Sequence, residues 1–417
     1  MEQSLHSRMD KHREGRKYAV WALAFFVILL FNVFERLSFE SMKVAAHFTI
    51  ELTFYAAGVL FIYLLLKKRY ELDMYAFLFV GVGGYLATTV VTQLINGNMH
   101  HGEGLLYLCL YLAFFCVVAL FDWVEDTLVW FAYIANGCLY LFFLDWLILG
   151  RPLERFTSYF TNPNISGVFF LCLFVLVLLG FHRAGFVSKL FFSVGLIFGL
   201  MMIYAATSRA IYLVLLIMLV SRIVFSISRK WFSRLFYVVM GFNLFFLFFY
   251  SYLAHTKIAQ SLDAWSMKYL HKSFFSGRED IWTPALEYGK ESPLTGYYVD
   301  IRPIDYMPNT HYIHSHNQYI QVFLESGLLG LLAFIGLLFV IWRILQRGLH
   351  IPAVRVVACF MLGLLFYQSV EISLFFNMKS IGFIQWFILG IGIHLAIQAR
   401  NDESLGNKQV FSKNRWE

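Results

Sequence analysis

Charged residues are scarce in this chain of 417 residues, because Asp, Glu, Lys and Arg together make up only 14%, against about 25% in an ordinary globular domain. Hydrophobic residues make up 59%, and 46 Phe and 24 Tyr exceed what one soluble core of this length can bury. These proportions exclude a soluble enzyme and indicate a polytopic membrane protein. The net charge of +7 is spread over short loops, so nucleic acid is not an expected partner.

Cysteine is also rare, and its placement argues against disulfides. All five cysteines fall inside apolar runs, and none lies in a long loop. We therefore expect no disulfide framework, and the pattern gives no information about the redox compartment. We also expect no cleavable signal peptide, because the first apolar run is long enough to span a bilayer and no small-residue cleavage site follows it.

Long apolar runs dominate the rest of the sequence. About 17–25 consecutive apolar residues cross a bilayer as a helix. Twelve runs meet this description: 17–34, 47–66, 74–95, 105–121, 128–148, 165–181, 190–206, 210–227, 235–253, 327–343, 354–370 and 380–398. The sequence thus predicts an all-α polytopic membrane protein with about twelve transmembrane helices.

Lysine and arginine predict the orientation of these helices. With the N-terminus placed inside, the inner segments hold 21 Lys and Arg, whereas the short outer loops hold 6. Cytoplasmic loops carry such an excess. Both termini are therefore predicted to be cytoplasmic.

One polar stretch interrupts the pattern and gives the predicted organisation. Residues 254–326 lie on the outer side and contain four of the seven prolines and five of the 13 histidines. Loops of this length are commonly functional. Apolar spacing from Ile258 to Lys272 predicts an amphipathic helix along the membrane surface. The expected units are a nine-helix bundle (1–253), a periplasmic loop carrying the site (254–326), three further membrane helices (327–398) and a cytoplasmic tail (399–417).

Two arginines are candidate site residues on the outer face. Arg209, in Thr207-Ser208-Arg209, lies at the start of the eighth run, where placing a charge so close to hydrocarbon costs free energy. Three interpretations are open: Arg209 belongs to a functional site, its side chain extends to the lipid headgroups, or it pairs with Asp145. Arg278 follows Ser276, whose spacing to Glu279 is that of a capping box. That would put Arg278 in a first helical turn, where an anion is favoured, although Thr283-Pro284 is a rival helix start.

Histidines and asparagines form the other two candidate features. His311, His314 and His316 fall within six residues, before Asn317. A metal site is one reading, but no carboxylate nearby in the sequence completes a ligand set, so no metal is expected. A single histidine acting as general base is more economical. Asn164, in Asn162-Pro163-Asn164 before the sixth run, is a candidate helix N-cap.

Two outer arginines and a histidine suggest a reaction. Arginine grips phosphate bidentately and keeps its charge, so two arginines suit a diphosphate. A histidine can deprotonate a hydroxyl. The combination predicts group transfer from a lipid diphosphate to a hydroxyl acceptor, and no phosphate-binding Gly-rich loop calls for a nucleotide.

These residues resemble a known family. His316-Asn317, nine further residues and Gly327-Leu328-Leu329-Gly330 look like the signature of the bacterial O-antigen ligase family. The resemblance covers roughly residues 160–345. Further landmarks similar to those of the family are Asn162-Pro163-Asn164, Thr207-x-Arg209, Gly277-Arg278-x-x-x-Trp282, Pro293-Leu294-Thr295-Gly296 and Glu325-Ser326-Gly327.

The resemblance implies a glycosyltransferase of the C superfamily that needs no metal or other cofactor. It would lie in the bacterial inner (plasma) membrane and act at the periplasmic face in lipopolysaccharide biosynthesis. There it would move a glycan from undecaprenyl diphosphate to a sugar hydroxyl of lipid A–core, with inversion at the anomeric carbon. By the same resemblance His316 is the base or acceptor-orienting residue, Arg209 and Arg278 hold the diphosphate, and Asn317, Asn164 and His314 contribute to substrate binding. Membrane lipids surround it.

Three alternatives stay open at this point. The same family contains O-antigen and exopolysaccharide polymerases, whose acceptor is another lipid-linked glycan, and protein O-oligosaccharyltransferases. A transporter belongs to a different class. It would place charges and broken helices near the bilayer midplane, whereas the polar residues here gather at the outer surface.

Overall fold

The computed structural model describes residues 19–98, 101–123, 125–153, 155–254, 256–270, 273 and 277–413, and these residues form helices without a β-sheet. The first helical segment, Ala19–Arg36, ends in the 3-10 turn η1 (Val33–Arg36). The long helices that follow are α2 (Glu40–Lys67), α3 (Leu72–Ile95), α4 (Gly102–Leu120), α5 (Glu125–Ile148), α6 (Pro163–Phe181), α7 (Phe186–Ala206), α8 (Arg209–Ile227), α9 (Arg229–Ala254), α13 (Gln318–Arg347), α14 (Pro352–Tyr367) and α15 (Lys379–Lys413). The short elements are α10 (Lys257–Leu270), α11 (Glu279–Gly289), α12 (Pro303–Tyr306) and η3 (Phe376–Met378).

Ten helices in the described part of the chain are long and apolar enough to cross a membrane. A helix satisfies all its backbone hydrogen bonds internally, which is why apolar runs of this length fold this way in lipid. The α14 helix is apolar but shorter, and α9, at the place of the ninth predicted run, is outside the set of ten. The all-α polytopic class is confirmed, whereas the count of twelve spans stays a prediction.

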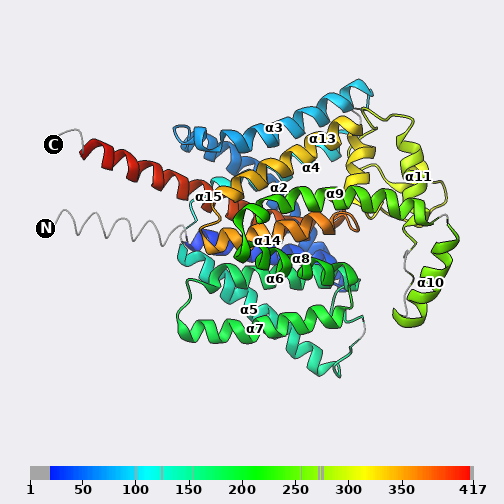
Figure 1. Ribbon diagram of the computed structural model, residues 1–417, viewed down its shortest axis with the longest axis horizontal. Coiled ribbons are helices and arrows are strands. Elements are labelled where there is room, and N and C mark those ends of the chain that lie inside the picture. Colours follow the sequence, from blue (N-terminus) through cyan, green and yellow to red (C-terminus); the bar gives the residue numbers. More distant parts are fainter. Residues whose placement is uncertain are drawn as a thin grey trace.

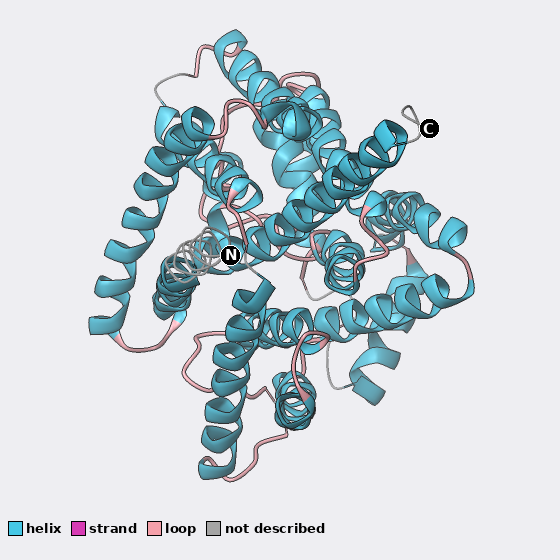
Figure 2. Ribbon diagram, turned by 90° about the vertical axis from the view of Figure 1, so that its left-hand side faces the viewer, coloured by secondary structure: helices cyan, strands magenta, loops and turns pink. Residues whose placement is uncertain are grey.

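The helices run between two opposite ends of the molecule (Figure 1). At one end lie α10 and α11, together with the joint between α7 and α8; we call this end the loop face. The last helix, α15, extends from the other end. Inside the bundle, α15 and α6 are almost enclosed by their neighbours, whereas α2, α7 and α8 leave most of their surface exposed. Figure 2 looks onto the end of the bundle from which α15 extends towards the C-terminus. The central helices thus form the scaffold for the loop face.

The predicted amphipathic segment of the loop is a helix, α10. Its apolar side chains Ile258, Trp265 and Tyr269 are exposed. The rival helix start at Thr283-Pro284 is wrong, because α11 begins at Glu279 and contains Pro284 in its interior.

A sharp bend divides α13. The helix begins at Gln318, before the predicted start at residue 327, and its backbone leaves helical geometry at Gly327, with φ 63° and ψ −163°. This combination belongs to a region that is essentially restricted to glycine. The first glycine of the Gly327-Leu-Leu-Gly330 motif therefore has a backbone role.

The turn Pro293-Leu294-Thr295-Gly296 packs directly into this bend. The N–H groups of Leu328 and Leu329, just beyond the bend, donate to the carbonyls of Pro293 and Leu294 at 2.9 and 3.2 Å. A Cβ on Gly327 would stand 2.2 Å from the Leu294 carbonyl carbon, and one on Gly296 would stand 2.5 Å from the Gly327 nitrogen. Both glycines are needed for this close backbone approach, which makes up for hydrogen bonds that the bend removes.

We predict that Gly327→Ala lowers the thermal stability of the purified protein, because it combines a forbidden backbone conformation with a steric clash. The expected cost is about 1–3 kcal/mol or more. Apparent unfolding midpoints in detergent would measure it. Gly336→Ala is the control, since Gly336 lies in the same helix with open space around it. Equal midpoints for the two variants would contradict the role assigned to the bend.

Candidate functional site

The site is built around a buried segment, residues 368–375, that follows the end of α14 at Tyr367. The side-chain amide of Asn317 donates to the carbonyl of Ser369 at 2.9 Å, and the N–H of Gln318 donates to the carbonyl of Gln368 at 2.8 Å. These bonds fasten the segment to the first turn of α13. Because buried backbone groups need partners, these bonds fix the 368–375 segment relative to the first turn of α13.

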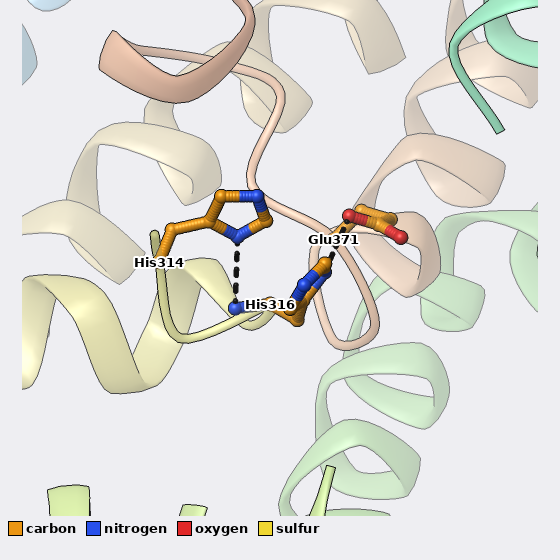
Figure 3. A group of neighbouring side chains, drawn as sticks. All are labelled: His314, His316 and Glu371. Atoms are coloured by element: carbon orange, nitrogen blue, oxygen red, sulfur yellow. Dashed lines mark hydrogen bonds and ion pairs between the residues drawn. The ribbon is translucent and has the colours of Figure 1, made fainter. Parts of the chain in front are cut away.

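His316 and Glu371 meet across this junction (Figure 3). The Nδ1 atom of His316 lies 3.0 Å from Oε2 of Glu371. His316 has a positive φ of 53°, and Asn317 directly after it caps α13 by accepting bonds from the N–H groups of Tyr319 and Ile320. Asn317 is thus a structural cap whose amide also holds the 368–375 segment. One-third of the His316 side chain is exposed, whereas only 2% of Glu371 is.

Glu371 is a buried carboxylate with three polar neighbours. Besides His316, Arg278 Nη2 lies 3.5 Å from Oε1, and the side-chain amide of Asn164 donates to Oε1 at 3.2 Å. Burial opposes ionisation, but the hydrogen bond from His316 and the charges of His316 and Arg278 outweigh it and hold the pKa of Glu371 below its ordinary value. Glu371 is therefore an ionised acceptor at neutral pH, and His316 Nδ1 must carry the hydrogen that the bond requires. This leaves Nε2 of a neutral His316 as a free base.

Arg278 reaches the site from the start of α11. It occupies the N-cap position just after Gly277, which has a φ of 71°, so it precedes the first turn in which the sequence predicts it. Ser276, the predicted capping residue, lies outside the described residues. Arg278 Nη2 also donates to the carbonyl of Val370 at 2.7 Å. Trp282, one turn into α11, is fully buried and donates to the Ser315 carbonyl at 2.8 Å, which ties α11 to the histidine loop.

Arg209 is the first residue of α8 and follows Thr207, which has the left-handed φ of 52° that ends α7. Its Nη2 donates to the carbonyl of Ser273 at 2.9 Å. The charges of Arg209 and Arg278 act on each other, and both act on Tyr250 of α9. Arg209 and Arg278 therefore lie in one electrostatic neighbourhood, as the sequence predicts, although they come from helices far apart in the chain.

The prediction that Asn164 caps α6 is wrong by two residues. Asn162 is the cap, and its side chain accepts the N–H of Asn164 at 2.8 Å. Pro163 occupies the first helical position, where its fixed φ suits a helix and its missing N–H costs nothing. The shift frees the Asn164 side chain to bind Glu371, so Asn164 does reach the site.

His314 and His316 have different surroundings. The two rings are 3.9 Å apart, and His314 Nδ1 accepts the backbone N–H of His316 at 3.3 Å. Burial, and next the charge of His316, lower the pKa of His314 to about 3, so its ring is neutral at physiological pH. His311 is exposed. The three histidines thus do not act as one group.

His314, His316 and Glu371 could together offer ligands to a metal, because one atom of each lies within 4.8 Å of the others. However, Nδ1 of His316, Nδ1 of His314 and both oxygens of Glu371 already have partners. The Arg278 charge also stands beside Glu371, where a divalent cation would be repelled. The geometry suits a hydrogen-bonded base better than a metal centre.

A cavity of about 660 Å³ opens beside His314 on the loop face. Arg36 and Lys379 lie at one part of its wall, and the ring of His101 stacks on Tyr298 at 3.7 Å at another. Carboxylates of Glu103, Asp300 and Asp305 complete the polar lining. Aromatic faces together with carboxylates and cations are suited to a polar, hydroxylated ligand.

Glu371 is the site residue that sequence reasoning missed. It is 55 positions from His316 and directly follows an apolar run, so nothing local marks it. The one cue in the sequence is its position: Glu371 is an acidic residue at the outer end of the eleventh predicted run, on the same predicted side as His316.

Comparison with known proteins supports the resemblance drawn from the motifs. Residues 194–335 match the family model described as O-antigen ligase. The match contains Arg209, Arg278 and the histidine motif, whereas Asn164 and Glu371 lie outside it. Members of this family are membrane glycosyltransferase-like enzymes. No curated protein matches the chain.

We predict that the purified protein carries no stoichiometric metal and that a chelator leaves its unfolding midpoint unchanged, because Arg278 already neutralises Glu371. Elemental analysis and thermal unfolding with and without the chelator would check this. A metal that co-purifies in equal amount and is lost from His314→Ala and His316→Ala alike would contradict the prediction.

Proposed function

We propose that this protein is an O-antigen ligase that transfers a glycan from undecaprenyl diphosphate to a sugar hydroxyl of lipid A–core. The observation that carries the proposal is the His316–Glu371 pair beside Arg278, within electrostatic reach of Arg209. The family match over residues 194–335 supports the same class of chemistry. The excess of Lys and Arg in the opposite loops supports a periplasmic loop face in the bacterial inner membrane.

The two arginines would bind the donor diphosphate. Each uses an Nη2 atom to bond a backbone carbonyl, Arg209 to Ser273 and Arg278 to Val370, which holds each guanidinium in place. A guanidinium carries five N–H donors in a planar fork, whose geometry matches phosphate oxygens. Negative charge grows on the leaving diphosphate as the glycosidic bond breaks, and fixed cations stabilise that charge most in the transition state.

His316 would activate the acceptor. Glu371 accepts the Nδ1 hydrogen, so Nε2 is free to take the proton of a sugar hydroxyl. The acceptor oxygen then attacks the anomeric carbon, the bond from that carbon to the diphosphate oxygen breaks, and undecaprenyl diphosphate leaves. Attack from the face opposite the leaving group inverts the anomeric centre. The cavity bordered by His314 is the proposed acceptor side, since the His314 ring is 3.9 Å from the His316 ring, Arg209 and Arg278 do not line the cavity, and its lining groups suit a sugar.

We predict that His316→Ala lowers the transfer rate by about 100- to 10,000-fold, as expected for a lost general base. Glu371→Gln should lower it by at least about tenfold, because an orienting partner is lost. Purified protein with an undecaprenyl-diphosphate-linked glycan and rough lipopolysaccharide would give the rates. His311→Ala is the control because His311 is exposed.

The donor arm of this series uses Arg278→Lys and Arg209→Lys, which keep charge but lose the planar fork. Both should reduce transfer far more than Arg151→Lys, a change at an exposed residue of an outer loop. Full activity in His316→Ala would refute the catalytic assignment, and full activity in Arg278→Lys would remove Arg278 from diphosphate binding.

The acceptor decides between ligase and polymerase, and we predict the ligase outcome. A deletion strain should lose all long-chain O-antigen from its lipopolysaccharide while lipid-linked polymer accumulates. Electrophoresis of lipopolysaccharide and mass spectrometry of the lipid-linked glycans would show this. Core capped by a single repeat unit would instead identify a polymerase, and unchanged lipopolysaccharide would refute both.

A further inference from the structure

A second cavity, of about 380 Å³, lies on the other side of the bundle from the site, between α6, α7, α8 and α14. Most of its wall is apolar, formed by Phe174, Leu178, Leu200, Leu215, Met218, Leu219, Val356 and Cys359. The polar lining is basic: His182, Arg222 and Arg355. These three residues lie where α6 and α8 end and α14 begins, at the end of the molecule opposite the loop face (Figure 1).

Three arginines gather around one ring at this place. The guanidinium carbons of Arg222, Arg229 and Arg355 lie 5.9, 5.8 and 5.2 Å from the centre of Phe225. The charges of Arg222 and Arg229 both act on Arg355. In the described part of the chain, no carboxylate forms an ion pair with any of the three. The Nε atom of Arg355 is also buried without a hydrogen-bond partner.

This cluster is unfavourable by itself. Like charges at close range repel, and the surrounding apolar wall and lipid screen them poorly. Contact with one aromatic face recovers only about 0.5–2 kcal/mol per cation. A bound anion would relieve the repulsion and supply an acceptor for the unpartnered N–H of Arg355.

We propose that the cavity and its three arginines bind an anionic membrane phospholipid, with the phosphate at Arg222 and Arg355 and an acyl chain in the apolar cavity. Charge complementarity supports an anion, and guanidinium groups match phosphate oxygens bidentately. The apolar wall supports a lipid, because a soluble anion would leave it unfilled. By the Lys and Arg bias this end is cytoplasmic, where anionic lipid headgroups attract basic clusters beside transmembrane helices.

The test uses delipidated full-length protein in neutral detergent, with native mass spectrometry to measure binding of phosphatidylglycerol. Arg222→Gln together with Arg355→Gln should weaken binding by about tenfold or more. The control is Arg234→Gln, which removes one charge that lies over Trp231 at the same end. Leu219→Trp should also weaken binding by filling the cavity, whereas Leu216→Trp should not, because both leucines are exposed on α8 but only Leu219 lines the cavity.

The two possible sources of phosphate are separated by competition. Inorganic phosphate and glycerol 3-phosphate should not displace phosphatidylglycerol, because they lack an acyl chain. Displacement by either at comparable concentration would overturn the lipid assignment. So would equal phosphatidylglycerol binding by the arginine pair variant and Arg234→Gln. Unfolding midpoints of every variant verify that each has folded.

Discussion

A buried carboxylate is the constraint on which the loop face depends. Glu371 is 2% exposed, and an ionised group there is tolerated only if partners replace water. Those partners are Asn164 of α6, Arg278 at the N-cap of α11, and His316, which lies two residues before α13 begins. One charge thus brings together three segments, of which the first and the last are more than a hundred positions apart in the chain. Breaking any one of them leaves a charge poorly compensated, so the site and the local fold are coupled.

The bend in α13 makes this convergence possible. If α13 continued straight through residue 327, the N–H groups of Leu328 and Leu329 could not donate to the carbonyls of Pro293 and Leu294 in the turn. That turn is also held from α3, where Asn96 donates its side-chain amide to the carbonyl of Gly296 at 2.7 Å. The first turn of α13, which positions His316 and Asn317, is therefore braced by α3 through a turn of the loop. Two glycines carry this brace because no side chain fits between the two backbones.

The sequence was enough to predict the membrane class, and it singled out Arg209, Arg278 and His316, which the structure brings to the loop face. Their roles and the side of the membrane that they face stay predictions. Apolar length and Lys and Arg bias are properties of single segments, so they can be read without a structure. Glu371 could not be found in this way, because its role comes from a contact across 55 positions. The cap of α6 was misplaced because Asn162 and Asn164 are equally good caps in isolation. Only Pro163 between them distinguishes the two, since it is favoured directly after a cap.

The same electrostatic argument connects both ends of the molecule. At the loop face Arg278 stands beside the buried carboxylate of Glu371, and Arg209 and Arg278 each donate to a backbone carbonyl, so the positive charge there is partly compensated. At the opposite end three arginines share one phenylalanine without any carboxylate among the described residues. Under the proposed function the loop face has to release a diphosphate after each turnover, and partial compensation favours this because full positive charge would bind the product too tightly. A site that holds a structural lipid has no such requirement. The difference in charge compensation therefore fits transient anion binding at the loop face and lasting anion binding at the other end.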